Sequence, residues 1–309
     1  MRNAVAALAA LGMMAIWTAE AHALRFVVDS TVDAPDASAG DGVCLSTAGG
    51  CTLRAAFQQA NDLTFRVDVI EIPAGTYPLT GTGGGGAPLG RLTSDRRSGP
   101  LEIRGAGPTE TIIVGPGAAS GQAAFLFASD TKISGVTIRE GGAAGVQLGT
   151  PVADGGFTMI DCIVEDNAND SGGGGITSSG TLGPATFVRT LFRNNTSDQD
   201  GGALRLSTTR VEIRRSTFTG NTAGGRGGAI SSTTPTMIEN ATIVGNTAGN
   251  DGGGLHASMS DVTILNTTIA RNTATNQISM NGFGTSPTVQ NSIVEGSCGT
   301  TIGGGAVIS

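Results

Sequence analysis

A repeat of about 26 residues constrains this chain more than any other feature. An asparagine followed six and seven residues later by Gly-Gly occurs at four markers: Asn167, Asn195, Asn221 and Asn246. Weaker matches extend the series at Gly141, Asn272 and Ser297. Neighbouring markers are 25 to 28 residues apart. A regular repeat of this length predicts a solenoid, in which each unit packs on the next.

Two positions of the repeat are apolar in all seven copies. Eight residues before each marker lie Ile133, Met159, Phe187, Ile213, Ile238, Ile264 and Val289. Three residues before it lie Ile138, Val164, Phe192, Phe218, Ile243, Ile269 and Val294. Between these columns, six residues before the marker, lie Gly135, Asp161, Arg189, Arg215, Asn240, Asn266 and Asn291. Because glycine and asparagine tolerate a left-handed backbone, this third column predicts a corner.

The segments between corners predict strands. They are 4–6 residues long and rich in β-branched residues and threonine, whereas paired helices need longer apolar runs and less glycine. The chain has 50 glycines in 309 residues. We therefore expect an all-β fold, a right-handed parallel β-helix with three-strand coils of about 26 residues and at least seven coils over residues 101–309.

The N-terminus predicts export. Arg2 precedes an apolar run over residues 4–17, and Ala21-His22-Ala23 resembles a signal-peptidase site. An uncleaved anchor is the alternative, but the run is short for a bilayer. We expect a signal peptide over residues 1–23, a secreted or cell-surface location and no transmembrane helix in the mature chain.

A short helix is expected to cap the solenoid. Residues 51–61 place Leu53, Ala56, Phe57 and Ala60 on one face, with Thr52 as N-cap. We assign residues 24–80 to an N-terminal capping segment and residues 81–100 to a glycine-rich loop insertion. This loop lacks the Lys-Ser/Thr of a phosphate-binding loop.

The four cysteines have different expected roles. Cys44 and Cys51 flank one short loop, which favours a disulfide in an exported protein. Cys162 and Cys298 belong to coils five steps apart, or roughly 24 Å, so they should not pair. Cys162 lies in a column of small residues and is expected to fill space in the core. Cys298 could pair with another chain.

The N-terminal region also resembles a known family. Gly40-Asp41-Gly42-Val43-Cys44, Gly50-Cys51-Thr52-Leu53-Arg54-Ala55-Ala56 and Ala60-Asn61 resemble the CSLREA-type domain of secreted bacterial β-helix proteins. Ile72-Pro73-Ala74-Gly75-Thr76-Tyr77 looks like the same family. The coils resemble polymorphic outer-membrane-protein and pectin-lyase-like repeats. The resemblance implies a groove over one strand face, where enzymes of the superfamily use aspartates with arginine, lysine or Ca²⁺.

The strand after each Gly-Gly is the counterpart of that groove. We expect its outward side chains to be Thr177, Ser179, Arg205, Ser207, Ser231, Thr233, His256 and Ser258. Because none is a carboxylate, no catalytic residue or metal ligand is assigned. Arg205, which can pair with a uronate, and His256, expected as a solvated face residue, are the candidate binding residues.

Other charges predict structural roles. Asp200, Arg226 and Asp251, in successive turns, are expected to form ion-pair ladders. A second set, Arg139, Glu165 and Arg193, is expected to do the same. The cluster of Asp29, Asp33, Asp36 and Asp41 could bind Ca²⁺ but lacks a calcium-loop spacing.

The sequence favours a non-catalytic β-helix with a structural, adhesive or polysaccharide-binding role, and no cofactor. A polysaccharide lyase or glycoside hydrolase with an unrecognised site is the alternative. A polysaccharide or cell-surface polymer is the expected partner. The net charge of −7, without a basic cluster, argues against nucleic acid.

Overall fold

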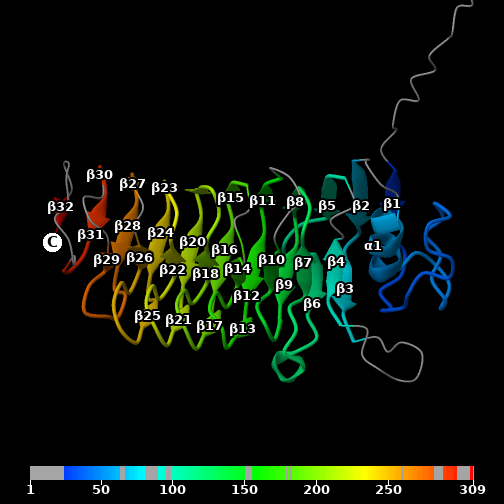
Figure 1. The fold of residues 1–309 in the computed structure, drawn as a ribbon, viewed down its shortest axis with the longest axis horizontal. Helices are drawn as coiled ribbons and strands as arrows, with labels where there is room; N and C mark the ends of the chain where they lie inside the picture. The colour runs from blue at the N-terminus through cyan, green and yellow to red at the C-terminus, as the bar shows by residue number, and fades with distance from the viewer. Residues whose placement is uncertain are drawn as a thin grey trace, which may run out of the picture.

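The structure is a computed structural model that describes residues 24–62, 67–80, 90–94, 99–149, 155–178, 180, 183–258, 261–281, 288–297 and 307–308. The expected signal peptide, all of the stretch 81–89 and Cys298 lie outside these ranges. Within them, the chain winds into an elongated stack of coils with one helix at its N-terminal end (Figure 1).

Three long sheets run along the stack, and neighbouring strands pair in parallel throughout. Sheet 1 contains β1 (Arg25–Val27), β2 (Asp68–Ile72), β5 (Leu101–Gly105), β8 (Thr131–Ser134), β11 (Phe157–Ile160), β15 (Ala185–Val188), β19 (Val211–Arg214), β23 (Thr236–Glu239), β27 (Val262–Leu265) and β30 (Thr288–Gln290). Sheet 2 contains β3 (Gly75–Pro78), β6 (Thr111–Val114), β9 (Thr137–Arg139), β12 (Ile163–Glu165), β16 (Leu191–Arg193), β20 (Thr217–Thr219), β24 (Thr242–Val244), β28 (Thr268–Ala270), β31 (Ile293–Val294) and β32 (Val307–Ile308).

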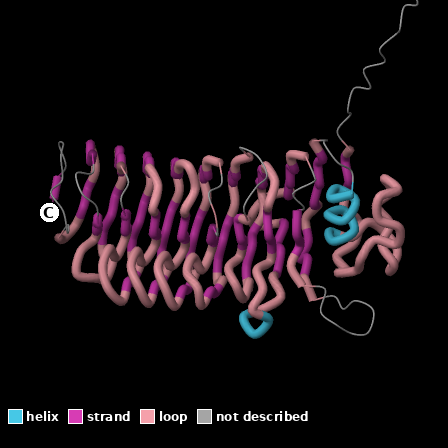
Figure 2. The backbone as a smooth tube through the Cα atoms, viewed as in Figure 1, coloured by secondary structure: helices cyan, strands magenta, loops and turns pink. Residues whose placement is uncertain are grey.

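Sheet 3 follows the Gly-Gly turns. It contains β4 (Leu92–Ser94), β7 (Phe125–Phe127), β10 (Val146–Leu148), β14 (Ile176–Ser178), β18 (Leu204–Leu206), β22 (Ile230–Ser232), β26 (Leu255–Ser258) and β29 (Ile278–Asn281). A short fourth sheet contains β13 (Ala168–Asn169), β17 (Thr196–Ser197), β21 (Thr222–Ala223) and β25 (Thr247–Ala248). The tube in Figure 2 shows these strands repeating coil after coil, with loops between them.

The strand register confirms the repeat. Ile213 pairs with Ile238, and Ile238 pairs with Ile264, so one turn of the stack equals one repeat. Every member of the two apolar columns is fully buried. The expected parallel β-helix is therefore confirmed. Because β2 and β3 already pair with β5 and β6, the stacked sheets begin before residue 101, the expected start.

The corners are also confirmed. All seven residues of the predicted corner column have positive φ, from 48° at Arg189 to 66° at Gly135. The first glycine of each Gly-Gly pair is left-handed too, with φ of 77° at Gly201. The second approaches the next coil so closely that a Cβ on Gly202 would lie 2.1 Å from the carbonyl oxygen of Gly228. A side chain at either glycine would therefore strain the turn.

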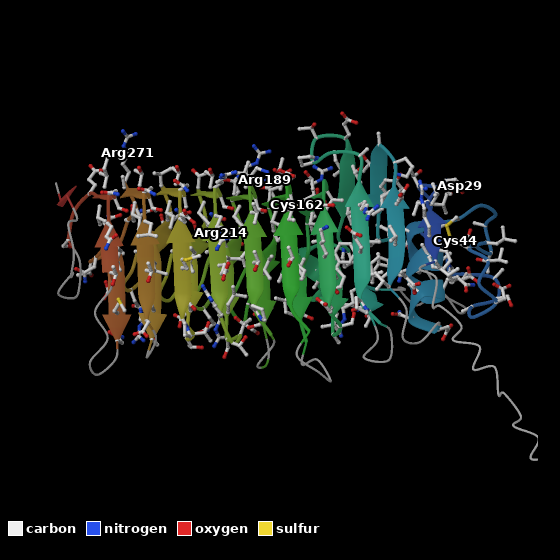
Figure 3. The ribbon with its side chains drawn as sticks, turned by 90° about the horizontal axis from the view of Figure 1, so that it is seen from above. Asp29, Cys44, Cys162, Arg189, Arg214 and Arg271 are labelled. Carbon is white, nitrogen blue, oxygen red and sulfur yellow. A yellow bond between two sulfur atoms is a disulfide. The ribbon has the colours of Figure 1, made fainter. Side chains whose placement is uncertain are left out.

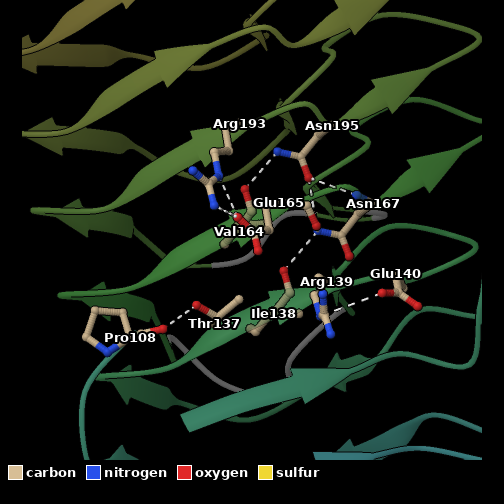
Figure 4. Close-up of polar contacts among 10 residues, drawn as sticks. All are labelled: Pro108, Thr137, Ile138, Arg139, Glu140, Val164, Glu165, Asn167, Arg193 and Asn195. Carbon is tan, nitrogen blue, oxygen red and sulfur yellow. Dashed lines mark hydrogen bonds and ion pairs between the residues drawn. The ribbon is translucent and has the colours of Figure 1, made fainter. Parts of the chain in front are cut away.

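A buried asparagine ladder joins the marker positions. The Asn195 Nδ2 donates to Asn221 Oδ1 at 3.0 Å, and the Asn221 Nδ2 donates to Asn246 Oδ1 at 2.9 Å. The backbone N–H groups of Asn195 and Asn221 donate to the same acceptor oxygens. The amides also donate to backbone carbonyls, as Asn195 does to Val164 at 2.9 Å (Figure 4). Gln277 Oε1 accepts from Asn272 and ends the ladder.

The capping helix α1 (Leu53–Asp62) covers the N-terminal end of the core. The Thr52 hydroxyl accepts from the Ala55 N–H at 3.1 Å, which confirms the expected N-cap. Phe57 is buried with its ring centroid 5.6 Å from that of Phe125. A buried ion pair between Arg54 and Asp33 holds the helix to the preceding segment.

The described cysteines agree with their expected roles. Cys44 and Cys51 form a disulfide with Cα atoms 5.0 Å apart (Figure 3). Cys162 is a buried free thiol in the small-residue column, and burial raises its pKa to about 12. It therefore packs as a neutral side chain.

We predict that Asn221→Ala destabilises the stack by about 3–5 kcal/mol, because it leaves two buried donors of Asn195 without their acceptor. Urea unfolding measures the effect, with Thr222→Ala as the control, since Thr222 is the exposed neighbour. A loss for Asn221→Ala no larger than that of the control would show that the ladder contributes little.

Candidate binding groove

A groove of about 420 Å³ runs along the outer face of sheet 3. Its floor comes from β14, β18, β22 and β26, and one wall comes from the turns that precede the Gly-Gly pairs. The lining residues are Ser178, Gly180, Asp200, Arg205, Leu206, Ser207, Arg226, Ser231, Thr233, His256 and Ser258. The outward residues of the strands and the charged residues of the turns thus form one site.

A second hollow, lined by Arg226, Asn250, Asp251, Thr275 and Asn281, adjoins the first through Arg226. Together the two extend from β14 to β29, four coil steps or roughly 19 Å along the axis. The combined groove is open and lined mainly by hydroxyl, amide and charged side chains. This shape suits an extended polar ligand better than a compact apolar one.

Two expected outward residues, Ser231 and His256, are in fact buried. His256 is only 2% exposed, so its assignment as a solvated face residue is wrong. The turns carrying Asp200 and Arg226 line the same groove and help to shield this part of the sheet from solvent. Arg205 is exposed, as expected, and Ser179 lies outside the described residues.

Carboxylates enter the groove from the turns, although the strand face itself has none. Asp200 Oδ1 accepts from the Arg226 backbone N–H at 2.7 Å. Asp251 Oδ1 accepts from the Gly252 N–H and the Asn276 amide, each at 2.9 Å. Burial acts to raise the pKa of Asp251, but hydrogen bonds from Ser279, Asn276 and Gly252 outweigh it and leave that pKa lowered. Asp251 is therefore held as a carboxylate.

Several arginines outside the groove form ion pairs with carboxylates. Arg189 pairs with Asp161 at 2.6 Å. In the second charge set, Arg193 pairs with Glu165 at 2.5 Å, as expected (Figure 4). Its third member, Arg139, pairs instead with the adjacent Glu140 at 3.6 Å. Figure 3 shows Arg189 and Arg271 along one edge of the stack.

The predicted ladder of Asp200, Arg226 and Asp251 is not formed. Among the described residues, the Arg226 guanidinium has no hydrogen bond or ion pair, and only its backbone N–H contacts Asp200. Arg205 forms no ion pair there either and donates only to the Ser171 carbonyl, at 2.9 Å. Asp200 Oδ1 accepts from the backbone N–H of Arg226 and not from its side chain.

His256 is the most unusual polar group of the groove. Its Nε2 lies 3.0 Å from the Ser258 hydroxyl, and its Nδ1 is buried without a partner among the described residues. Burial lowers its pKa below the ordinary 6.5, the Arg226 charge lowers it further, and Asp200 and Asp251 act in the opposite direction. The ring is therefore neutral at pH 7.

The described residues include no group of three or more histidine, cysteine or acidic side chains able to hold a metal ion. In the N-terminal acidic cluster, Asp33 pairs with Arg54 and Asp36 Oδ1 accepts from Gln59 at 3.0 Å. The carboxylate of Asp29 accepts from the Cys51 N–H at 2.7 Å. These aspartates organise the capping segment. No helix in the described part of the chain is long and apolar enough to cross a membrane.

Comparison with known proteins agrees with this architecture. The family described as "Right handed beta helix region" matches residues 153–308. The chain belongs to this family. As a member of the right-handed β-helix family, it is similar in structure to pectin methylesterase from carrot, with a TM-score of 0.44 and 12% identity over 80% of this chain and 70% of that one. No curated protein matches the sequence.

We predict that acid weakens this β-helix partly through His256. Because its folded-state pKa lies below 6.5, the unfolded chain binds the proton more readily, and stability falls as the pH drops through 6.5. Urea unfolding at about pH 7.5 and 5.5 measures this loss. His256→Gln should show a smaller loss than the parent chain, and an identical loss in both would contradict the assignment.

Proposed function

We propose that this protein is an exported, surface-associated β-helix that binds an acidic polysaccharide in the sheet 3 groove without cleaving its backbone. The observation that carries the proposal is the pair of arginines, Arg205 and Arg226, which form no ion pair among the described residues and line a groove rich in hydroxyl groups. An exposed guanidinium offers several donors to a uronate or sulfate. The binding could serve adhesion or matrix structure.

Export is part of the proposal. The apolar N-terminus supports a signal peptide, and the Cys44–Cys51 disulfide suits an oxidising compartment. The resemblance of the N-terminal segment to the CSLREA-type domain supports a secreted or cell-surface protein of bacterial type. The helix and disulfide of that segment would then protect the open end of the solenoid from association through its strand edges.

The order of charges along the groove suggests which polymers fit. Arg205 and Arg226 lie in adjacent coils, about 5 Å apart along the axis. Asp200 lies in the coil of Arg205, and Asp251 lies in the coil after Arg226. The Arg205 guanidinium reaches the Ser171 carbonyl of the preceding coil, so Asp200 lies between the two cations along the axis and Asp251 lies beyond Arg226. Such an order favours a polymer whose anionic groups are separated by neutral units, since closely spaced anions would meet Asp200 or Asp251.

Several observations argue against cleavage of the backbone. Glycosidic hydrolysis needs a protonated carboxyl group as acid, with a second carboxylate about 5–9.5 Å away. Asp200 and Asp251 lie two coils apart, roughly 10 Å along the axis, and Asp251 is held ionised. That separation is at the upper end of the range, and an ionised Asp251 has no proton to donate as the acid, so the groove favours binding over cleavage.

We predict that the purified chain binds hyaluronan, which has one carboxylate per disaccharide, more tightly than dextran, which is neutral. Calorimetry at low and high salt measures the affinity, which should fall with salt because the contacts are ionic. Arg226→Gln should weaken binding about tenfold, a loss of about 1.4 kcal/mol.

Arg215→Gln is the matched control, because Arg215 is an exposed arginine at a corner outside the groove. If Arg226→Gln and Arg215→Gln bind hyaluronan with equal affinity, the groove is not the binding site. If dextran and hyaluronan bind equally well, ionic contacts do not determine the affinity.

We also predict no cleavage of bound polymers. Hyaluronan and polygalacturonate incubated with the protein, with and without Ca²⁺, should gain neither reducing ends nor ultraviolet-absorbing unsaturated ends. New ends that disappear in the Arg226→Gln variant would instead establish a lyase or hydrolase in this groove.

A further inference from the structure

His256 is built into the floor of the groove rather than onto its surface. It lies in β26, between Ser231 of β22 and Ser279 of β29 in the strand register. The ring is 2% exposed and still lines the groove. Both lateral neighbours are small and uncharged, so the strands beside the ring offer it no ionic partner.

The hydrogen bonding of the ring is incomplete. Nε2 shares a 3.0 Å contact with the Ser258 hydroxyl, whereas Nδ1 is enclosed and has no partner among the described residues. Buried polar atoms in folded proteins nearly always have a partner. An unpaired nitrogen beside a polar groove is a position that a bound ligand or a proton can change.

Three charges face the ring from the turns. Arg226 comes from the turn before β22, and Asp200 and Asp251 come from the turns before β18 and β26. Burial and Arg226 oppose a positive charge on the imidazole, and the two aspartates favour it. Arg226 is the one positive charge among these three. An anion bound to Arg226 therefore offsets the charge that disfavours protonation of the His256 ring.

We propose that His256 takes up a proton from solvent when an anionic group of the polymer binds Arg226, so that mild acid strengthens binding. The inference rests on the proposed function. The bound anion offsets the charge of Arg226, and the ring then carries a proton on both nitrogens. By thermodynamic reciprocity, a ligand that favours the protonated ring is itself bound more tightly by it.

Titration calorimetry with hyaluronan tests this coupling. Near pH 6, measurements in two buffers of different ionisation heat give the number of protons taken up on binding. We expect a fractional uptake of up to one proton, and an affinity that rises about fivefold between about pH 7.5 and 5.5. His256→Gln should bind with no uptake and a flat pH profile. Arg215→Gln, which changes an exposed arginine outside the groove, should behave as the parent chain.

Imidazole NMR provides an independent measurement on the unaltered protein. The sequence has two histidines, His22 and His256, so the signals are simple to assign. Saturating hyaluronan should move the His256 titration to higher pH. Binding without a shift and without proton uptake would overturn the inference and leave the proposed function standing. An absence of hyaluronan binding at every pH would overturn both.

Discussion

The buried asparagine ladder is the interaction on which the rest of this β-helix depends. Apolar columns hold the coils together, but they do not by themselves fix how the chain turns between sheets 2 and 3. The ladder does so, because each amide binds the next coil and the backbone of its own turn. A buried amide left without these bonds is costly, so the geometry of every turn is tightly specified.

The Gly-Gly pair completes that specification. With Asn221 fixed, Gly227 must turn left-handed and Gly228 must pass close to the carbonyl oxygen of Gly253. The strand that follows then begins at the same height in each coil. This repetition aligns the side chains of sheet 3 into a continuous face and brings the turn residues beside it. The groove is thus a consequence of the same contacts that hold the core.

Much of the scaffold could be predicted from the sequence because the solenoid repeats its environment. The seven residues of one repeat position, from Ile133 to Val289, all occupy the same kind of buried site, so the sequence shows the apolar preference of that site seven times. The corner column was recognisable for the same reason, even where Asp161 or Arg189 replaces glycine or asparagine. The asparagines mark the repeat in the sequence, but their burial is not obvious from their polarity. The signal for a buried ladder is that the same polar residue recurs next to columns that are apolar.

The groove was harder to predict because its residues do not repeat. Alternation along the strand after Gly-Gly predicts that Arg205 and His256 point outward from the sheet. It does not predict how far each side chain is exposed to solvent. The burial of His256 depends on how the turns lie beside sheet 3. Similarly, the alternating charges of the turn column predict an ion pair between Arg226 and Asp200, whereas the Asp200 carboxylate accepts from the Arg226 backbone N–H.

The hydrogen bond from the Arg226 backbone N–H to Asp200 distinguishes the groove from the other faces of the solenoid. On sheets 1 and 2, arginines and carboxylates in neighbouring strands meet side chain to side chain, as Arg214 meets Glu239 at 3.7 Å and Arg193 meets Glu165. In each such pair the two charges offset each other, so the pair has little net charge with which to attract a ligand. In the turns, Asp200 and Asp251 accept from backbone N–H groups, and neither pairs with the Arg226 side chain. Among the described residues the exposed Arg226 guanidinium forms no ion pair, so it is the cation that we propose an anionic ligand contacts. This difference in pairing separates a structural face from a candidate binding face.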